Sequence, residues 1–276
     1  ALWAVGALWC IPAMLGPPLF SRDVYSYLAQ GEILHLGLNP YHDPPVVLAA
    51  HGHAHLLHAV SPFWRHTTAP YGPLFLGIVS LFAGATAAHL VAGALLARLL
   101  DLVGIALVAV FVPRLARALG ADPARAVWLA ALSPLVLLGL IAAGHNDALM
   151  AGLMVAGVAL AVEGKPLAGV ALCALAATIK LPAAAAIVFI AAAEMRVSTR
   201  FIVRAAALAL AVLAIVTLAT GVGLDWVTTG VFSTPQKVRL AITPSTGVGY
   251  TIASVLHDFG AYANARSIES AVAGVF

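Results

Sequence analysis

Long apolar stretches recur along the whole chain, and they constrain its fold more than any other feature. Residues 126–143 and 205–224 contain no charged side chain, and a helix needs about 20 apolar residues to cross the hydrocarbon core of a bilayer. Because such stretches are spread over the sequence, a single cleavable signal peptide does not account for them. The pattern predicts an all-α membrane protein, folded as a multi-pass bundle of transmembrane helices.

The composition agrees with a lipid environment. Of the 276 residues 62% are hydrophobic and 9% charged, whereas soluble domains usually carry about 25% charged residues. The net charge of +3 comes from basic residues scattered in short loops, so attraction to anionic lipids explains it better than binding of nucleic acid. Cys10 and Cys173 lie within apolar stretches, and we interpret both as packing residues.

Weaker apolar stretches extend the bundle, and the basic residues between them predict its orientation. Further spans are expected at 88–112, 148–162, 166–179 and 181–193. Lys and Arg are enriched in cytoplasmic loops, so we place three connections in the cytoplasm, which contain Arg114, Arg117, Arg125, Lys165, Arg196, Arg200 and Arg204. The opposite face then carries residues 16–70, the turn at 144–147, Lys180 and residues 225–247.

We expect one transmembrane domain over residues 1–276, with residues 16–70 as a long first extracytoplasmic loop. The chain begins at Ala1 inside an apolar run, which predicts that it is a fragment of a longer protein. Residues 71–87 would break the alternation of spans if they crossed fully, so a juxtamembrane or re-entrant helix is expected there. The first half of the loop predicts an amphipathic helix lying on the membrane surface through Tyr25, Leu28 and Ile33.

Two adjacent residues at the membrane edge are candidates for chemistry. Asp23 directly follows the first apolar helix, where partial desolvation could leave its carboxylate basic enough to deprotonate a sugar hydroxyl. The alternative is an exposed aspartate in the first turn of a helix. Arg22 could hold a phosphate by two parallel hydrogen bonds, or pair with Asp23 or a lipid headgroup. Solvated loop positions are expected for Glu32, His42 and Asp43.

Other polar residues stand inside or between the predicted spans. Arg98 and Asp101 are three residues apart, which predicts an intramembrane ion pair on one helix face. A helix cap needs one polar residue, so the three at the next turn suggest binding of a substrate, with Asp147 as a second acid–base candidate beside His145 and Asn146. His51, His53, His55 and His58 lack a nearby cysteine or carboxylate, and we expect no metal site there.

Positive charge on the predicted outer face points to an anionic ligand. Lys180 stands between two short apolar helices, where it could reach lipid headgroups or hold the phosphate of a membrane-embedded substrate. Lys237 and Arg239 add charge on the same face. This distribution departs from the usual enrichment of basic residues on the cytoplasmic side.

Four segments together resemble a known enzyme family. They are FSRDVYSYLAQGEILHLGLNPY, TTAPYGPLFL, AAGHNDALM and ATIKLPAAA. In this order they resemble the actinobacterial polyprenol-phosphomannose-dependent α-1,6-mannosyltransferases, which belong to the GT-C superfamily of membrane glycosyltransferases. The resemblance runs from about residue 20 to about residue 250, and the first segment is the most specific.

The resemblance implies an activity and a place for it. Such enzymes move mannose from polyprenyl phosphate mannose to a lipid-anchored α-1,6-mannan acceptor of lipomannan and lipoarabinomannan, at the outer face of the plasma membrane. It implies that Asp23 is the catalytic base, that Lys180 and Arg22 bind the donor phosphate, and that Asp147 faces the same cavity. We expect no cofactor. The alternatives are a secondary transporter, which would need an inverted repeat that the sequence does not show, and a noncatalytic subunit for envelope assembly.

Overall fold

The computed structural model describes residues 2–195, 198–233 and 244–258, which contain helices, turns and loops and no strand. The chain divides into two compact units, residues 1–234 and 235–276. In the second unit the described element is helix α13 (Pro244–Asp258). Lys237 and Arg239, two of the predicted phosphate ligands, lie outside the described residues.

Among the described residues, three helical stretches are long and apolar enough to cross a membrane. They are α5 (Leu90–Ala118), residues Pro123–Ala142 and α11 (Thr199–Thr220), and they cover the predicted spans at 88–112, 126–143 and 205–224. The middle stretch is broken into α6 (Pro123–Ala131), α7 (Pro134–Val136) and a π-helical turn (Leu137–Ala142). Pro134 causes the break, because it lacks the N–H that a continuous helix would use there.

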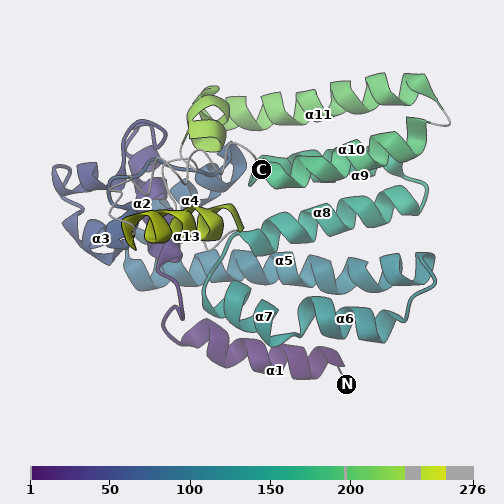
Figure 1. Cartoon of the computed structure of the whole chain (residues 1–276), viewed down its shortest axis with the longest axis horizontal. Helices are drawn as coiled ribbons and strands as arrows, with labels where there is room; N and C mark the ends of the chain where they lie inside the picture. The colour runs from purple at the N-terminus through teal and green to yellow at the C-terminus, as the bar shows by residue number, and fades with distance from the viewer. Residues whose placement is uncertain (1, 196–197, 234–243, 259–276) are drawn as a thin grey trace. The chain divides into compact units, whose positions relative to one another are not determined.

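Shorter helices complete the bundle at the predicted places. They are α1 (Leu2–Leu15), α8 (Asp147–Val162), α9 (Pro166–Ala177) and α10 (Ala184–Met195). Helix α8 contacts both α5 and α9, and α9 contacts α10 and α11, so these helices form a row (Figure 1). Helices α5 and α8 approach closely at Gly104 and Gly152, because a Cβ on either glycine would overlap backbone atoms of the other helix.

The segment between α1 and α5 folds into a cap against one end of these helices (Figure 1). It contains α2 (Asp23–His35), α3 (Ala54–Ala59), α4 (Pro73–Thr86) and the short 3₁₀ turns Pro45–Ala49 and Pro62–Trp64. Helix α4 has 14 residues, a length of about 21 Å at 1.5 Å per residue. This is too short to cross a hydrocarbon core of about 30 Å without tilt or thinning.

Helix α2 is buried inside the cap, which corrects its predicted position on the membrane surface. Leu28 is 3% exposed and Ile33 is fully buried, and both pack against Leu48 and Leu56 from the following turns. Glu32, expected in a solvated loop, is a buried residue of the same helix. The prediction was wrong because the rest of the loop folds back and covers the apolar face that was assigned to lipid.

Arg98 joins three parts of the bundle and does not form the predicted ion pair with Asp101. Its Nη1 donates to the carbonyl oxygens of Met14 and Gly16 at 3.0 and 2.6 Å, and its Nη2 donates to the Ala142 carbonyl at 3.0 Å. The carbonyls at the end of a helix have no partner within the helix, and the guanidinium supplies one. Asp101 is also buried, and its Oδ2 has no hydrogen-bond partner within the described ranges.

Candidate functional site

The turn that enters α2 fixes the position of Asp23. Phe20 adopts a left-handed conformation with φ of 64°, which reverses the chain after the Pro17–Pro18 pair. The Ser21 hydroxyl oxygen then accepts a hydrogen bond from the Asp23 backbone N–H at 3.1 Å. Asp23 is therefore the first residue of α2, where the positive end of the helix dipole stabilises a carboxylate.

Each oxygen of the Asp23 carboxylate faces a different partner. The Trp64 indole Nε1 donates a hydrogen bond to Oδ1 at 3.0 Å, and the His145 Nε2 lies 3.6 Å from Oδ2. Sequence reasoning missed Trp64, because one tryptophan in a loop 41 residues away forms no pattern with Asp23. His145 was predicted from its turn, and the structure brings that turn against the start of α2.

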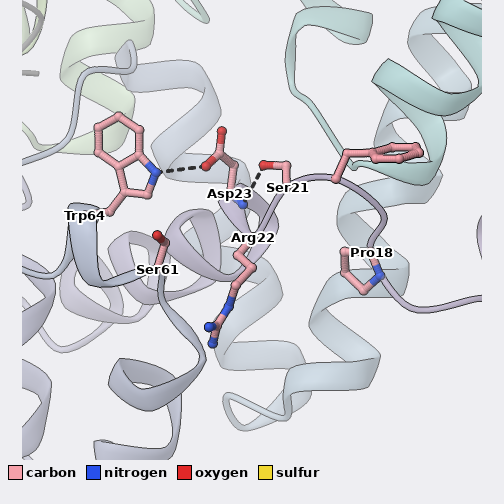
Figure 2. A pocket seen from close by; sticks show the side chains of 7 residues that line it. Pro18, Ser21, Arg22, Asp23, Ser61 and Trp64 are labelled. Atoms are coloured by element: carbon pink, nitrogen blue, oxygen red, sulfur yellow. Dashed lines mark hydrogen bonds between the residues drawn. The ribbon is translucent and has the colours of Figure 1, made fainter. Parts of the chain in front are cut away.

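A pocket of about 390 Å³ opens beside Asp23, within the size range of about 300–1,000 Å³ usual for small-molecule sites (Figure 2). Figure 2 shows the Arg22 side chain turned away from the Asp23 carboxylate. Its Nη2 donates to the His58 carbonyl at 3.0 Å, so Arg22 does not pair with Asp23. The pocket is lined by Pro18, Phe20, Ser21, Arg22, Asp23, Ser61 and Trp64.

A second charged pair joins α8 to the connection between α9 and α10. The Lys180 Nζ donates to Asp147 Oδ1 and Oδ2 at 2.9 and 2.8 Å, and the two side chains are 31% and 39% exposed. The ammonium also lies 5.8 Å from the centre of the Tyr71 ring, within the range of a cation–π interaction. Lys180 is thus held in place and still reaches solvent.

Backbone contacts hold Tyr71 beside Lys180. The Gly72 N–H donates to the Ile179 carbonyl at 2.9 Å, and the Leu74 N–H donates to the Thr178 carbonyl at 3.0 Å. A Cβ on Gly72 would overlap the Thr178 carbonyl, so this approach requires glycine. The start of α4 is thereby fixed to the chain that leads into Lys180.

The two pairs lie side by side because His145 and Asp147 belong to one turn. The Tyr71 phenol interacts electrostatically with both pairs. Burial raises its pKa most, and the nearby negative charges of Asp23 and Asp147 raise it further. The structure therefore brings Asp23, His145, Asp147 and Lys180 to one end of the bundle. Asn146 points inward instead, being 1% exposed, and neither amide atom of its side chain has a partner within the described part of the chain.

The imidazole rings of His51, His53 and His55 contact other parts of the cap. His53 Nε2 lies 3.3 Å from the Oε1 of Glu32. His51 and His55 contact the backbone carbonyls of Val47 and Ala88. Across residues 2–195, 198–233 and 244–258, no group of three His, Cys, Asp or Glu side chains is placed to hold a metal ion.

Comparison with known proteins shows the family of this chain. The family model described as "Alpha-(1->6)-mannopyranosyltransferase, N-terminal domain" matches residues 1–196. The chain belongs to the α-(1→6)-mannopyranosyltransferase family. That match includes Asp23, the turn at 144–147 and Lys180.

Curated members of this mannopyranosyltransferase family are similar over much of the chain. The α-(1→6)-mannopyranosyltransferase A of Mycobacterium tuberculosis is 39% identical, over 93% of this chain and 50% of its own length. Enzyme A of Corynebacterium glutamicum is 37% identical over 65% of this chain and 36% of its own, and enzyme B of that organism is 33% identical over 56% and 26%. The chain spans about half the length of the first of these relatives. No solved structure matches it.

The site of this mannopyranosyltransferase-family chain combines two chemical capacities. Among the described residues, Oδ1 of the Asp23 carboxylate accepts a hydrogen bond from Trp64, whereas Oδ2 has no hydrogen-bond donor and can accept a proton. The ammonium of Lys180 has three donors, two of which point to Asp147. A carboxylate and an ammonium are thus each held by a residue of the turn at 144–147.

Proposed function

We propose that this chain forms the catalytic region of a GT-C-type membrane mannosyltransferase. It would move mannose from polyprenyl phosphate mannose to a lipid-anchored α-1,6-mannan in lipomannan and lipoarabinomannan assembly, at the outer face of the plasma membrane. One observation carries the proposal: a single turn contacts both Asp23 and Lys180. His145 of that turn lies 3.6 Å from the Asp23 carboxylate, and Asp147 accepts a hydrogen bond from Lys180. Asp23, the turn of His145 and Asp147, and Lys180 are far apart in sequence, and together they supply the base and the cation that such a transfer needs.

The proposed reaction is a single displacement at the anomeric carbon of mannose. Oδ2 of Asp23 takes the proton of the acceptor hydroxyl, whose oxygen forms the new bond to that carbon. The bond between the carbon and the phosphate oxygen breaks, and polyprenyl phosphate leaves with the electron pair. Lys180 stabilises the growing negative charge on the phosphate, an effect that is strongest where donors are already in place.

Other predicted ligands have proposed places around these two residues. Arg22 lies on the pocket beside Asp23, where the rest of its guanidinium can reach a phosphate. Asp147 holds Lys180 and can also accept from a sugar hydroxyl. For His145 and Asn146, which belong to the same turn as Asp147, we propose contacts with the substrate. For Lys237 and Arg239, which lie outside the described residues, we propose contacts with the donor phosphate.

The charge distribution supports an outward-facing site. Arg114 and Glu163 form an ion pair where α5 and α8 meet at the end away from Asp147. At that same end lie Arg117 in the last turn of α5, Arg125 in the first turn of α6 and Lys165 between α8 and α9. Because cytoplasmic loops carry an excess of Lys and Arg, this end is assigned to the cytoplasm and the site to the other side.

A donor assay in membranes tests the proposal. Membranes that contain the protein receive radiolabelled polyprenyl phosphate mannose and a mannan acceptor, and label in the acceptor is measured. We expect Asp23→Asn to lower transfer by about 100-fold or more while the protein still inserts. Glu194→Gln, on α10, is the matched control and keeps transfer. Wild-type turnover of Asp23→Asn would remove the proposed base, and transport of sugar without transfer would favour a secondary transporter.

A further inference from the structure

The two partners of Asp23 divide the roles of its oxygens. An indole N–H can only donate, so the bond from Trp64 occupies Oδ1 as an acceptor and fixes the orientation of the carboxylate. Oδ2 is the oxygen left to receive a proton. The group that faces it is an imidazole nitrogen, Nε2 of His145, which can accept a proton when it is unprotonated.

The fold holds the His145 ring against the first turn of α2. Gly144, with φ of 72°, turns the chain at the end of the π-helical segment and packs against Val24. The His145 N–H then donates to the Leu140 carbonyl at 2.9 Å. The separation of 3.6 Å between Nε2 and Oδ2 exceeds a hydrogen bond of about 2.7–3.2 Å. One bridging water, or a small shift when the acceptor binds, would connect them.

We propose that Asp23 and His145 form a proton relay, in which His145 receives the proton that Asp23 removes from the acceptor hydroxyl and Trp64 positions the carboxylate. The proposal rests on the proposed function. The acceptor O–H bond breaks and its proton binds Oδ2; it then moves from Oδ2 to Nε2, which leaves a carboxylate beside an imidazolium. The imidazolium releases the proton to water, and the site returns to its first state.

The surroundings favour this transfer. The Asp23 carboxylate is the anion that lies against the His145 ring, whereas Lys180 is paired with Asp147. Imidazole is the side chain that changes charge between about pH 5 and 8, so it can return the proton under ordinary conditions. The charged and titratable groups on the elements packed around the pair come from α2, the loop before α4, α5, α8 and the connection before α10: Arg22, Tyr27, Tyr71, Arg98, Asp101, Asp147 and Lys180.

The pH dependence of turnover separates a relay from a structural role. The transfer assay is run from acidic to alkaline pH on the wild type, His145→Gln and Trp64→Phe, with His66→Gln as an exposed control two residues from Trp64. We expect His145→Gln to lower kcat by roughly 10- to 100-fold with the donor KM nearly unchanged, and to move the acidic fall in activity to lower pH. Trp64→Phe, which keeps an aromatic ring but loses the indole N–H, should lower kcat by about 10-fold.

Each other result overturns the relay. If His145→Gln keeps the wild-type kcat, His145 does not receive the proton. The same holds if kcat falls but the decrease of activity at acidic pH stays at the same pH as in the wild type. Either result contradicts the relay alone if Asp23→Asn is inactive, because the proposed function then still holds. If Asp23→Asn is active, the proposed function itself is contradicted. Should His145→Gln fail to insert, His145→Asn carries the same test, and addition of imidazole to His145→Ala should restore part of the lost turnover.

Discussion

The Lys180 ammonium donates to both carboxylate oxygens of Asp147, 33 residues earlier, at 2.9 and 2.8 Å. The pair connects the first turn of α8 to the chain between α9 and α10. Both side chains are about one third exposed, and exposed pairs of this kind contribute about 0–1 kcal/mol to stability. We therefore expect this pair to contribute little to the stability of the fold, which leaves Lys180 free for the proposed role in binding the donor phosphate.

Lys180→Met should weaken donor binding without unfolding the protein. A hydrogen bond to a charged group contributes about 1.5–3 kcal/mol, so the donor KM should rise roughly 10- to 100-fold while thermal stability in detergent stays nearly constant. Titration of the donor in the transfer assay measures the KM. Lys165→Met is the matched control, an exposed lysine before α9. A wild-type donor KM in Lys180→Met would show that the phosphate binds elsewhere.

Arg98→Met should destabilise the bundle strongly. The substitution removes the donor that reaches the carbonyls of Met14 and Gly16, whereas the Ala142 carbonyl keeps its hydrogen bond from the Leu19 N–H. Leaving a buried polar group unsatisfied costs about 1–3 kcal/mol, so the loss of unfolding free energy should reach about 3 kcal/mol or more. Thermal unfolding in detergent measures it, with exposed Arg125→Met on α6 as control. Equal melting of the two variants would contradict the role assigned to Arg98.

The helices could be predicted from sequence because lipid imposes a simple rule on them. A span must be apolar over its whole length, and residues 205–224 show this directly, as α11 confirms over Thr199–Thr220. The row of short helices around α8 and α9 followed from the same rule together with Lys180 and the turn at 144–147. The polar residues of that turn could also be singled out from the sequence as candidates, because polar groups between apolar helices are few.

The cap could not be predicted in the same way. Its contacts join residues far apart in sequence, such as Trp64 with Asp23, and no local period records such a pairing. Helix α2 was assigned to the membrane surface because its alternation of polar and apolar residues suits an interface. The structure buries it under residues 45–60. Arg98 was paired with Asp101 by helical spacing alone, whereas its real partners are carbonyls of α1 and the π-helical turn.

Gly104→Ala should loosen the contact between α5 and α8. A Cβ at Gly104 would overlap the Ala148 carbonyl, a backbone atom that cannot rotate away. Overpacking a close contact costs typically about 1–3 kcal/mol, so thermal unfolding should move to lower temperature. Gly139→Ala is the control, because a Cβ there meets only the Leu135 side chain at 3.8 Å. If both variants melt like the wild type, the two helices have room to separate and the close approach is not required.

Asp225 should hold the loop of Asn39 and His42 in a pH-dependent way. Its Oδ2 accepts a hydrogen bond from Asn39 Nδ2 at 2.8 Å and lies 3.0 Å from His42 Nε2. The hydrogen bond from Asn39 lowers the pKa of the Asp225 carboxyl most, and His42 lowers it further. Because the folded pKa lies below the unfolded value, this contribution is present above the unfolded pKa and is lost as the pH falls through the folded pKa.

Hydrogen exchange of residues 39–43 as a function of pH measures this anchor. At neutral pH we expect faster exchange in Asp225→Asn than in the wild type, because the amide keeps one acceptor but loses the charge that attracts His42. As the pH falls through the folded pKa of Asp225, the wild-type carboxyl becomes neutral and the two proteins should converge. Glu194→Gln, which removes a charge on α10, should follow the wild type throughout. A difference that persists at acidic pH would mean that the carboxylate charge is not what holds the loop, and that the neutral hydrogen bond from Asn39 is sufficient.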